Sequence, residues 1–394
     1  LPYYIEGLFE DLDEVRKTPV GVVRDEKFFA NCKGFEVLTL TEAVAIDRQR
    51  KTVRVKNVES GEEREIPYSQ LVLATGNRPL MPPLPGIDLK GVYPLKTMGD
   101  ARRILDKARS ATRVVVVGGG FIGLEVAEAL IHRGLDVTLV EMKNQVMAGL
   151  LDAGMAALVH RELRKKGVNL RLAEGLQSID GRQGEVAGVK TSKGHYPADL
   201  VIVAIGVRPE VGLAKAAGLE LGPRGHIVVD EKLRTSDPDI FAVGDVIEVI
   251  DPVFKGKVAI PLAGPANRQA RIAADNICGG NSTYKGSLGT SIIKVNELTA
   301  ANVGYSERLL KSKGVQYEKI YLHPRSHASY YPGGTSLHIK VLFSKEGKIF
   351  GAQIVGKKGV DKRIDALAIA MLQGMDIREL AALELAYAPP YSSA

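Results

Sequence analysis

Residues 113–127 read Arg113-Val-Val-Val-Val-Gly118-Gly-Gly120-Phe-Ile-Gly123-Leu-Glu125-Val-Ala127, an apolar run that leads into a glycine-rich turn. The valines predict a buried strand and the residues after the turn predict a helix, which is the context that a G-x-G-x-x-G motif requires. Gly118 permits the tight turn, Gly120 lets the backbone approach a pyrophosphate, and Gly123 lets the helix pack closely on the strand. The free N–H groups and dipole of that helix attract phosphates. The motif therefore predicts a dinucleotide site, and the alternative is a glycine-rich turn that binds nothing.

Glu141 ends the next predicted strand, Asp136–Val140, where such sites place the acidic residue that contacts the ribose. Its carboxylate can accept hydrogen bonds from both ribose hydroxyls, and its charge would repel a 2′-phosphate. We therefore expect NADH as the coenzyme. Lys143 lies close enough to keep NADPH open as an alternative.

Two further strand ends suggest a second nucleotide. The stretch Thr235-Ser-Asp-Pro-Asp-Ile-Phe-Ala-Val-Gly244-Asp245 predicts a short apolar strand that ends at Gly244, where the backbone can approach a ligand. Asp245 then presents a carboxylate suited to a sugar or ribityl hydroxyl. The stretch Leu71-Val-Leu-Ala74-Thr75-Gly76 also runs from a strand into a glycine turn. The alternative for both is a plain turn without a ligand.

Length and composition limit the class of protein. A chain of 394 residues is too long for one average core, so two or three domains are expected. The basic excess is mild, with 53 Lys and Arg against 46 Asp and Glu, and it is scattered, so we expect no nucleic-acid partner. No apolar run approaches the ~18 residues of a membrane span, and no signal peptide is visible. These features and the low cysteine content predict a cytoplasmic protein without a membrane partner.

The pattern of predicted secondary structure changes along the chain. Between residues 97 and 205, predicted strands alternate with helices, which indicates a mostly parallel sheet covered on both faces. Thr97-Met-Gly-Asp100 is a capping-box variant that starts the first of these helices. Upstream, we predict a strand at Phe35–Leu40, and the prolines between residues 79 and 85 form a rigid connector that we interpret as a domain crossing. After Asn281, short strands and two closing helices predict an α+β domain.

Taken in order, these motifs resemble those of the FAD-dependent pyridine nucleotide–disulfide oxidoreductases. The order is Ala74-Thr75-Gly76, the Gly118–Gly123 turn with Glu141, Ala204-Ile-Gly206-Val-Arg208-Pro209, and Phe241-Ala-Val-Gly-Asp245. In that family the first and last motifs belong to FAD and the central turn to NAD(P)H. The likeness covers essentially the whole chain, and four motifs in sequence are more specific than any one of them.

Within the family the chain is similar to the coenzyme A-disulfide reductases and the related NADH oxidases and NAD(P)H sulfur or polysulfide reductases. The stretches that carry this likeness are Leu1-Pro-Tyr-Tyr-Ile5, Pro261–Gln269, Ala386–Ser393 and, more weakly, Tyr330–Gly334. The resemblance implies a flavoprotein that passes electrons from NAD(P)H through FAD to a disulfide or sulfur substrate, such as coenzyme A disulfide or polysulfide, with coenzyme A as substrate or bound thiol. The alternatives are an NADH oxidase or peroxidase, and a redox-sensing dinucleotide-binding protein without turnover.

The resemblance also implies a fold: an α/β protein with two Rossmann-like, glutathione reductase-like nucleotide-binding domains and an α+β C-terminal dimerisation domain, hence a homodimer. The implied boundaries are 1–88 and 211–282 for the FAD-binding domain, 89–210 for the NAD(P)H-binding domain and 283–394 for the dimerisation domain. The implied cofactor-binding residues are Ala74, Thr75, Gly76, Gly118, Gly120, Phe121, Ile122, Gly123, Glu125, Glu141, Gly206, Gly244, Asp245, Leu262 and Ala263.

The family has an N-terminal βαβ unit that binds the FAD pyrophosphate, and a single redox cysteine just before the stretch that matches Leu1–Ile5. We therefore expect this sequence to lack that unit and that cysteine. In the implied mechanism, NADH passes hydride to FAD, the reduced flavin reduces the cysteine partner, and the thiolate reacts with the sulfur substrate.

The same resemblance implies roles for several other side chains. Phe121 covers the flavin face until the nicotinamide displaces it, and Glu125 contacts the nicotinamide amide. Tyr330, Tyr331 and Tyr387 reach the active site of the partner subunit, where a phenol can donate a proton to a leaving thiolate. The alternatives are core packing for Phe121, a solvated helix charge for Glu125, and interface packing for the tyrosines.

No metal site is predicted. Cys32 and Cys278 are far apart and without metal-ligand spacing, so we expect two inert small hydrophobes. His323 and His327 flank Arg325 but have no third ligand in view, so we expect surface or interface residues.

Overall fold

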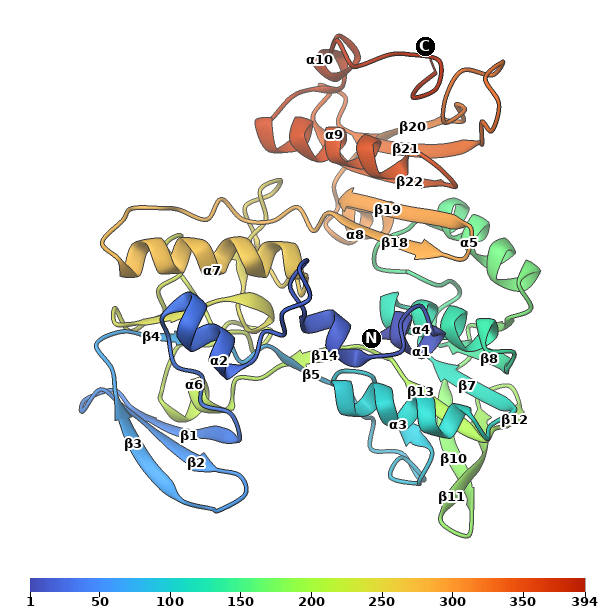
Figure 1. The fold of residues 1–394 in the computed structure, drawn as a ribbon. Helices are drawn as coiled ribbons and strands as arrows, with labels where there is room; N and C mark the ends of the chain where they lie inside the picture. The colour runs from blue at the N-terminus through green and yellow to red at the C-terminus, as the bar shows by residue number, and fades with distance from the viewer. Residues whose placement is uncertain (394) are drawn as a thin grey trace. The chain divides into compact units, whose positions relative to one another are not determined.

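The computed structural model describes residues 1–393, and the chain divides into two compact units, each assembled from separate stretches of sequence (Figure 1). The first unit is Leu1–Leu8, Pro79–Val207 and Leu288–Ala394, and the second unit is Phe9–Arg78 and Arg208–Ser287. The chain returns to the first unit at Pro79, where the proline-rich connector begins. The mixed α/β architecture is as predicted, and the division at residues 88, 210 and 282 stays a prediction.

A five-stranded sheet lies at the centre of the first unit. Its order is β6-β13-β7-β8-β9, and each neighbouring pair is parallel. Residues 114–117 are buried on both faces of the sheet, which explains why their sequence is continuously apolar instead of alternating. The strands are β6 (Val92–Tyr93), β7 (Arg113–Val117), β8 (Asp136–Glu141), β9 (Asn169–Leu172) and β13 (Leu200–Val203).

Amphipathic helices pack on this sheet and bury their apolar faces, with Ile104, Leu124 and Val159 fully enclosed in one core. The Thr97 hydroxyl accepts the Asp100 N–H at 3.1 Å, and Asp100 accepts the Thr97 N–H at 2.7 Å, which confirms the predicted capping box. The helices are α1 (Pro2–Glu6), α3 (Met98–Ala108), α4 (Phe121–His132) and α5 (Ala153–Lys165). A separate antiparallel sheet consists of β10 (Leu176–Arg182), β11 (Glu185–Thr191) and β12 (His195–Pro197).

The C-terminal part of the first unit is an antiparallel sheet with helices beside it, which confirms the predicted α+β character. The strand order is β18-β19-β22-β21-β20, and α9 packs on β19 and β22 (Figure 1). The strands are β18 (Ser291–Val295), β19 (Leu298–Gly304), β20 (Glu318–Leu322), β21 (Leu337–Phe343) and β22 (Ile349–Gly356). The helices are α8 (Glu307–Ser312), α9 (Val360–Gln373) and α10 (Ile377–Ala381).

The second unit contains a three-stranded antiparallel sheet, β1-β2-β3, and a parallel pair formed by β4 and β15. Its strands are β1 (Thr41–Asp47), β2 (Thr52–Asn57), β3 (Glu63–Pro67), β4 (Leu71–Leu73), β15 (Ile240–Ala242), β16 (Val249–Ile250) and β17 (Lys257–Val258). Its helices are α2 (Glu26–Phe28), α6 (Gly212–Ala216) and α7 (Ala263–Ile277), with helical turns η1 (Leu12–Arg16), η2 (Phe29–Lys33) and η3 (Gly244–Val246). The strands β5 (Asn77–Pro79) and β14 (Val207–Pro209) pair where the chain passes between the units.

The predicted strand at Phe35–Leu40 is wrong, because β1 begins only at Thr41. Helical backbone continues to Lys33, Gly34 then adopts a φ of 72°, and Leu40 adopts a φ of 52°. Left-handed residues at both ends interrupt an extended strand. Among the described residues, no helix combines the length and apolar composition that a membrane span requires.

A buried charge network joins the C-terminal sheet to the start of α5. Lys340 is 1% exposed and its ammonium contacts both Asp152, at 2.7 Å, and Glu307. Burial opposes ionisation of Glu307, but hydrogen bonds from Lys340, Tyr317 and Lys319 lower its pKa to about 2. The carboxylate therefore stays charged at any ordinary pH.

We expect acid to remove the contribution of Glu307 to stability. Its pKa is lowered from 4.5 to about 2 in the fold, so the contribution is complete above pH 4.5 and is lost as the pH falls towards 2. In thermal unfolding scans, Glu307→Gln should melt below the wild type at pH 7, and this gap should narrow below pH 4.5. The exposed turn variant Glu59→Gln serves as the control, with no gap at either pH. A gap for Glu307→Gln that stays constant down to pH 2.5 would contradict the assignment.

Candidate functional site

The glycines of the predicted dinucleotide turn have distinct steric surroundings in the first unit. Gly118 follows β7 with a φ of 110°, and a Cβ there would lie 2.3 Å from the Ala204 carbonyl oxygen, after β13. A Cβ on Gly123 would lie 1.9 Å from the Gly118 oxygen, so helix α4 can approach β7 only with glycine there. Beside Gly120 nothing lies within 4 Å of an added Cβ. Two glycines are thus required by packing, and the third faces open space.

This turn lies at the point where the strand order reverses. β7 has β8 on one side and β13 on the other, and the turn leaves the carboxyl end of β7. Open α/β sheets bind ligands in the crevice at such a switch point. Gly120 is the N-cap of α4 and no side chain caps this end, so the first N–H groups of the helix are available to a phosphate.

Glu141 is held in place by the backbone around the turn. Its Oε2 accepts the Gly119 N–H at 2.7 Å, and its Oε1 accepts the Lys143 N–H at 2.7 Å. A carboxylate has about four acceptor positions, so both oxygens keep room for a further hydrogen bond. The side chain therefore has two roles available: it closes the turn and it can receive ribose hydroxyls.

Glu141→Gln is expected to raise the use of NADPH relative to NADH. The amide keeps the shape of the side chain but removes the negative charge that repels a 2′-phosphate. We expect the ratio of kcat/KM values to shift towards NADPH by about tenfold, which corresponds to about 1.4 kcal/mol. Steady-state kinetics with both coenzymes measure it, and Glu174→Gln, a buried glutamate after β9, is the comparison. An unchanged ratio would mean that Glu141 does not contact the ribose.

The other predicted residues of this turn lie near its helix. Phe121 is partly buried and packs against the core, and Glu125 lies one turn further along α4, where burial raises the pKa of its carboxyl. Ile122, Ile205 and Met142 are 36%, 42% and 72% exposed, although each is a large apolar residue. Exposed apolar side chains at the carboxyl edge of a sheet suit a planar ring. Ile205 and Met142 were not predicted as site residues, although Ile205 lies in the Ala204–Pro209 motif and Met142 directly follows Glu141.

In the second unit, the two predicted FAD motifs come together. β4 and β15 are parallel neighbours, so the turn at residues 74–76 and the residues Gly244 and Asp245 leave the same edge. The Asn77 amide donates a hydrogen bond to Asp245 Oδ2. The Thr75 hydroxyl donates to the Glu210 carbonyl at 2.5 Å. Asn77 was missed, although it directly follows the quoted motif.

Helix α7 begins next to this pair. The buried Gln269 of α7 accepts the Gly244 N–H at 2.7 Å, and α7 packs on η3. Leu262 is the N-cap and offers no side-chain cap, so the N–H groups near Ala263 are free to meet an anionic or carbonyl oxygen. The second unit therefore gathers its predicted cofactor residues around one helix start.

The C-terminal tyrosines lie on two segments that touch. The Ala328 N–H donates to the Pro389 carbonyl at 3.1 Å, which joins the segment of Tyr330 and Tyr331 to that of Tyr387. Their side chains are 76%, 42% and 54% exposed, respectively. Exposure leaves all three available to a ligand or to a second subunit.

Two predictions about single residues need correction. His327 is not on the surface: it is 6% exposed and bonds to the Ser326 hydroxyl and the Pro332 carbonyl, both at 3.2 Å. Cys32 and Cys278 are free but exposed, so neither packs as a small hydrophobe. Cys32 lies within η2, and Cys278 directly follows α7 as its C-cap. His323 is exposed as predicted, and its Nδ1 lies 2.9 Å from that of His338.

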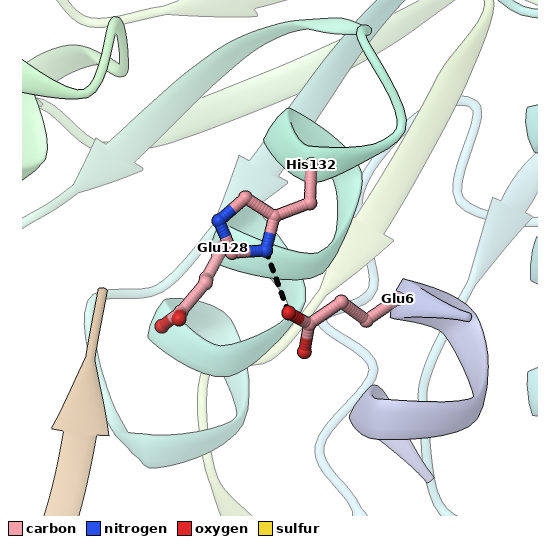
Figure 2. A group of neighbouring side chains, drawn as sticks. All are labelled: Glu6, Glu128 and His132. Atoms are coloured by element: carbon pink, nitrogen blue, oxygen red, sulfur yellow. Dashed lines mark hydrogen bonds and ion pairs between the residues drawn. The ribbon is translucent and has the colours of Figure 1, made fainter. Parts of the chain in front are cut away.

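One group of possible metal ligands is present in the described residues. Glu6, Glu128 and His132 place one ligand atom each within 4.8 Å of one another (Figure 2). His132 Nδ1 already bonds Glu6 at 2.6 Å, and Glu128 accepts the Asn296 N–H at 2.7 Å. These bonds connect α4 to α1 and to the turn after β18, so we interpret the group as a structural tie between these elements.

Comparisons with known proteins cover the whole chain. Residues 8–270 match the family model described as pyridine nucleotide-disulphide oxidoreductase, and residues 290–394 match its dimerisation domain. These matches confirm the resemblance predicted from the motifs. They do not bear out the expectation that an N-terminal nucleotide-binding unit and a redox cysteine are missing.

Individual relatives are similar over nearly the same span. An NADH oxidase of Methanocaldococcus jannaschii is 38% identical over 100% of this chain and 86% of its own length. A coenzyme A disulfide reductase of Staphylococcus aureus is 34% identical over 100% of this chain and 87% of its own. A solved NAD-dependent persulfide reductase from A. fulgidus has a TM-score of 0.97 and 42% identity, covering 100% of this chain and 72% of that one.

Proposed function

Because this chain belongs to the pyridine nucleotide-disulphide oxidoreductase family, we propose that it oxidises NADH and delivers the electrons through FAD to a sulfur acceptor, either coenzyme A disulfide or a persulfide or polysulfide. The observation that carries the proposal is the dinucleotide turn, with open space at Gly120 and an oriented Glu141 at the switch point of a parallel sheet. The relatives that reduce coenzyme A disulfide and persulfide support the choice of acceptor.

In this proposal the first unit binds NADH. Gly118 and Gly123 shape the turn, Gly120 and the N–H groups of Phe121 and Ile122 receive the pyrophosphate, and Glu141 receives the ribose. Burial raises the pKa of Glu125, so its carboxyl can remain protonated to a higher pH than that of an exposed glutamate. The protonated carboxyl can donate a hydrogen bond to the nicotinamide amide. Gly206, after β13, provides backbone at the other side of the switch point.

The second unit fits a flavin nucleotide by the chemistry of its residues. Asp245, oriented by Asn77, offers a carboxylate to a hydroxyl, while Gly244 and the turn at residues 74–76 allow the backbone to come close. Leu262 is the N-cap of α7, and Ala263 at the first position of the helix offers its backbone N–H. When bound, FAD supplies the electron relay between NADH and the acceptor, and the chain supplies orientation and electrostatics.

The C-terminal tyrosines complete the proposal. A phenol from Tyr330, Tyr331 or Tyr387 can donate a proton to the thiolate that leaves when a sulfur–sulfur bond is reduced. The match of residues 290–394 to a dimerisation domain supports a homodimer in which these tyrosines act at the partner's site. A cytoplasmic location stays a prediction.

Steady-state assays test the acceptor. With NADH as donor, we expect turnover with coenzyme A disulfide or polysulfide to exceed turnover with oxygen or peroxide. The 38% identical NADH oxidase favours a second candidate function, reduction of oxygen, and faster turnover with oxygen than with any sulfur acceptor would establish it instead. A flavin that NADH never bleaches would contradict both.

A further inference from the structure

The loop between β8 and α5, residues 142–152, lies directly against the dinucleotide turn. The Gly119 carbonyl accepts the Met147 N–H at 2.9 Å, while the Gly119 N–H donates to Glu141, the last residue of β8 before the loop. A Cβ on Gly119 would lie 2.9 Å from a methyl group of Val146. The position of the β8–α5 loop therefore determines the position of the middle glycine of the turn.

The loop is internally stiff, so a displacement at one end reaches the other. Met147 adopts a φ of 52°, and its carbonyl accepts the N–H groups of Leu150 at 2.8 Å and Leu151 at 2.9 Å. The Val146 N–H donates to His160 Nε2 at 3.1 Å. Burial lowers the pKa of His160, which keeps the ring neutral and its Nε2 available as an acceptor.

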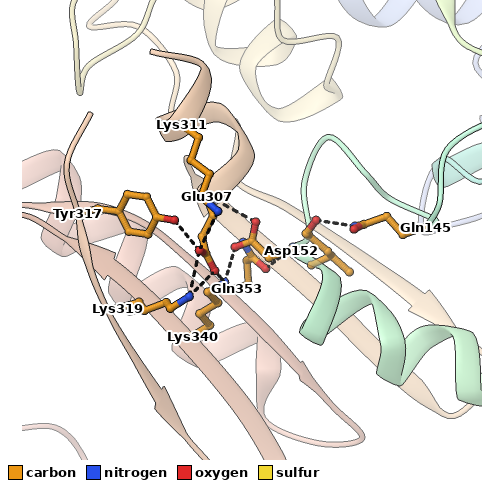
Figure 3. Close-up of polar contacts among 9 residues, drawn as sticks. Gln145, Asp152, Glu307, Lys311, Tyr317, Lys319, Lys340 and Gln353 are labelled. Carbon is orange, nitrogen blue, oxygen red and sulfur yellow. Dashed lines mark hydrogen bonds and ion pairs between the residues drawn. The ribbon is translucent and has the colours of Figure 1, made fainter. Parts of the chain in front are cut away.

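The far end of the loop, Asp152, is held at three of its polar atoms by the C-terminal sheet and the start of α8 (Figure 3). Its N–H donates to Gln353 Oε1 at 2.7 Å, and its Oδ2 accepts from Gln353 Nε2 and Lys340 Nζ, both at 2.7 Å. Its Oδ1 accepts the Glu307 N–H at 3.0 Å. Asp152 is 9% exposed and Gln353 is 1% exposed, so water cannot readily replace these partners.

The same network shows which changes would release Asp152 and which would not. Gln353 contacts Asp152 directly, through both atoms of its amide. Tyr317 donates to Glu307 at 2.5 Å on the other side of the network. Buried polar networks rigidify a structure only where every member is satisfied, so the loss of the Gln353 amide would loosen Asp152.

We propose that Asp152, Lys340 and Gln353 are positioning residues for the dinucleotide, through which the C-terminal sheet sets the affinity of the glycine turn for NADH. None of them touches the turn; they act through the stiff β8–α5 loop. The inference rests on the proposed function only in taking NADH as the ligand.

Gln353→Met tests this role, because methionine keeps the length of the side chain and removes both hydrogen bonds to Asp152. We expect the Kd for NADH, measured by equilibrium binding, and the KM to rise about tenfold, with kcat at saturating NADH unchanged within about twofold. Tyr317→Phe is the matched control: it removes a hydrogen bond from the same network without touching Asp152, so the affinity for NADH should stay at the wild-type value. Asp152→Asn, which keeps the size of the side chain, is the second variant should Gln353→Met fold poorly, and it should weaken NADH binding in the same way.

Hydrogen exchange of the coenzyme-free protein provides a readout that does not depend on catalysis. Peptides covering residues 142–152 should exchange faster in Gln353→Met and not in Tyr317→Phe. Folded Gln353→Met protein with wild-type NADH affinity and wild-type loop exchange would overturn the positioning role. Wild-type protein that binds no NADH would overturn the proposed function instead, while the loop exchange would still show whether the C-terminal sheet holds the loop.

Discussion

Gly120→Val is expected to leave the protein folded and to lower its affinity for NADH by at least about 100-fold, which corresponds to about 2.7 kcal/mol. Gly120 has a φ of −86°, which any residue adopts, and nothing within 4 Å of its Cβ position. A valine side chain at this position should therefore lower the stability of the ligand-free protein very little. It would occupy the space through which a pyrophosphate approaches the start of α4. Titration with NADH and a thermal unfolding scan measure the two effects separately.

Gly154→Val is the matched control for this change. Gly154 also has open space around it and no positive φ, but it lies at the exposed start of α5. The Gly154→Val variant should lose some helix stability and keep the wild-type affinity for NADH. If Gly120→Val binds NADH as tightly as Gly154→Val does, the open space at Gly120 is not where the dinucleotide lies.

Asp245→Ala is expected to yield protein that loses most of its flavin during purification, and with it the NADH-dependent activity. A hydrogen bond from a hydroxyl to a charged carboxylate contributes roughly 1.5–3 kcal/mol, so the flavin should bind on the order of 10- to 150-fold more weakly. The change also removes the carboxylate that accepts a hydrogen bond from the Asn77 amide. Absorbance and chromatography of the cofactor released on denaturation measure the occupancy and identify the flavin.

The comparison variant is Asp239→Asn in the same unit. Asp239 forms a half-exposed ion pair with Lys51 at 2.6 Å, and such ion pairs contribute little to protein stability. The flavin content of the Asp239→Asn variant should equal that of the wild type. Full occupancy in Asp245→Ala, or release of FMN from the wild type, would refute the assignment of Asp245 to FAD.

The dinucleotide turn could be predicted from sequence because its determinants are local. The valines of residues 114–117, the spacing of Gly118 and Gly123, and the acidic end of the next strand all lie within one βαβ segment. Gly118 and Gly123 each correspond to a steric requirement of the structure, because an added Cβ would collide with backbone atoms. The Thr97 capping box was predictable for the same reason, since its two partners are three residues apart.

The features that escaped prediction depend on contacts between distant residues. Lys340 and Asp152 are 188 positions apart, and lysine and aspartate are almost never fully buried unless paired, so a sequence gives no reason to bury either one. The partnership of Asn77 with Asp245 spans 168 positions.

The way the two units are assembled from separate stretches has a consequence for synthesis on the ribosome. β4 can pair only after β15 has been synthesised, about 170 residues later. Asp152 can form its hydrogen bonds to Lys340 and Gln353 only after those residues have been synthesised. A nascent chain that ends near residue 287 holds every stretch of the second unit, but its first unit lacks Leu288–Ala394. The second unit can therefore close before the first is complete, and the β8–α5 loop acquires its anchor only when the last strands emerge. A premature stop codon after residue 300 should consequently leave a chain whose second unit resists protease while the β8–α5 loop is cut.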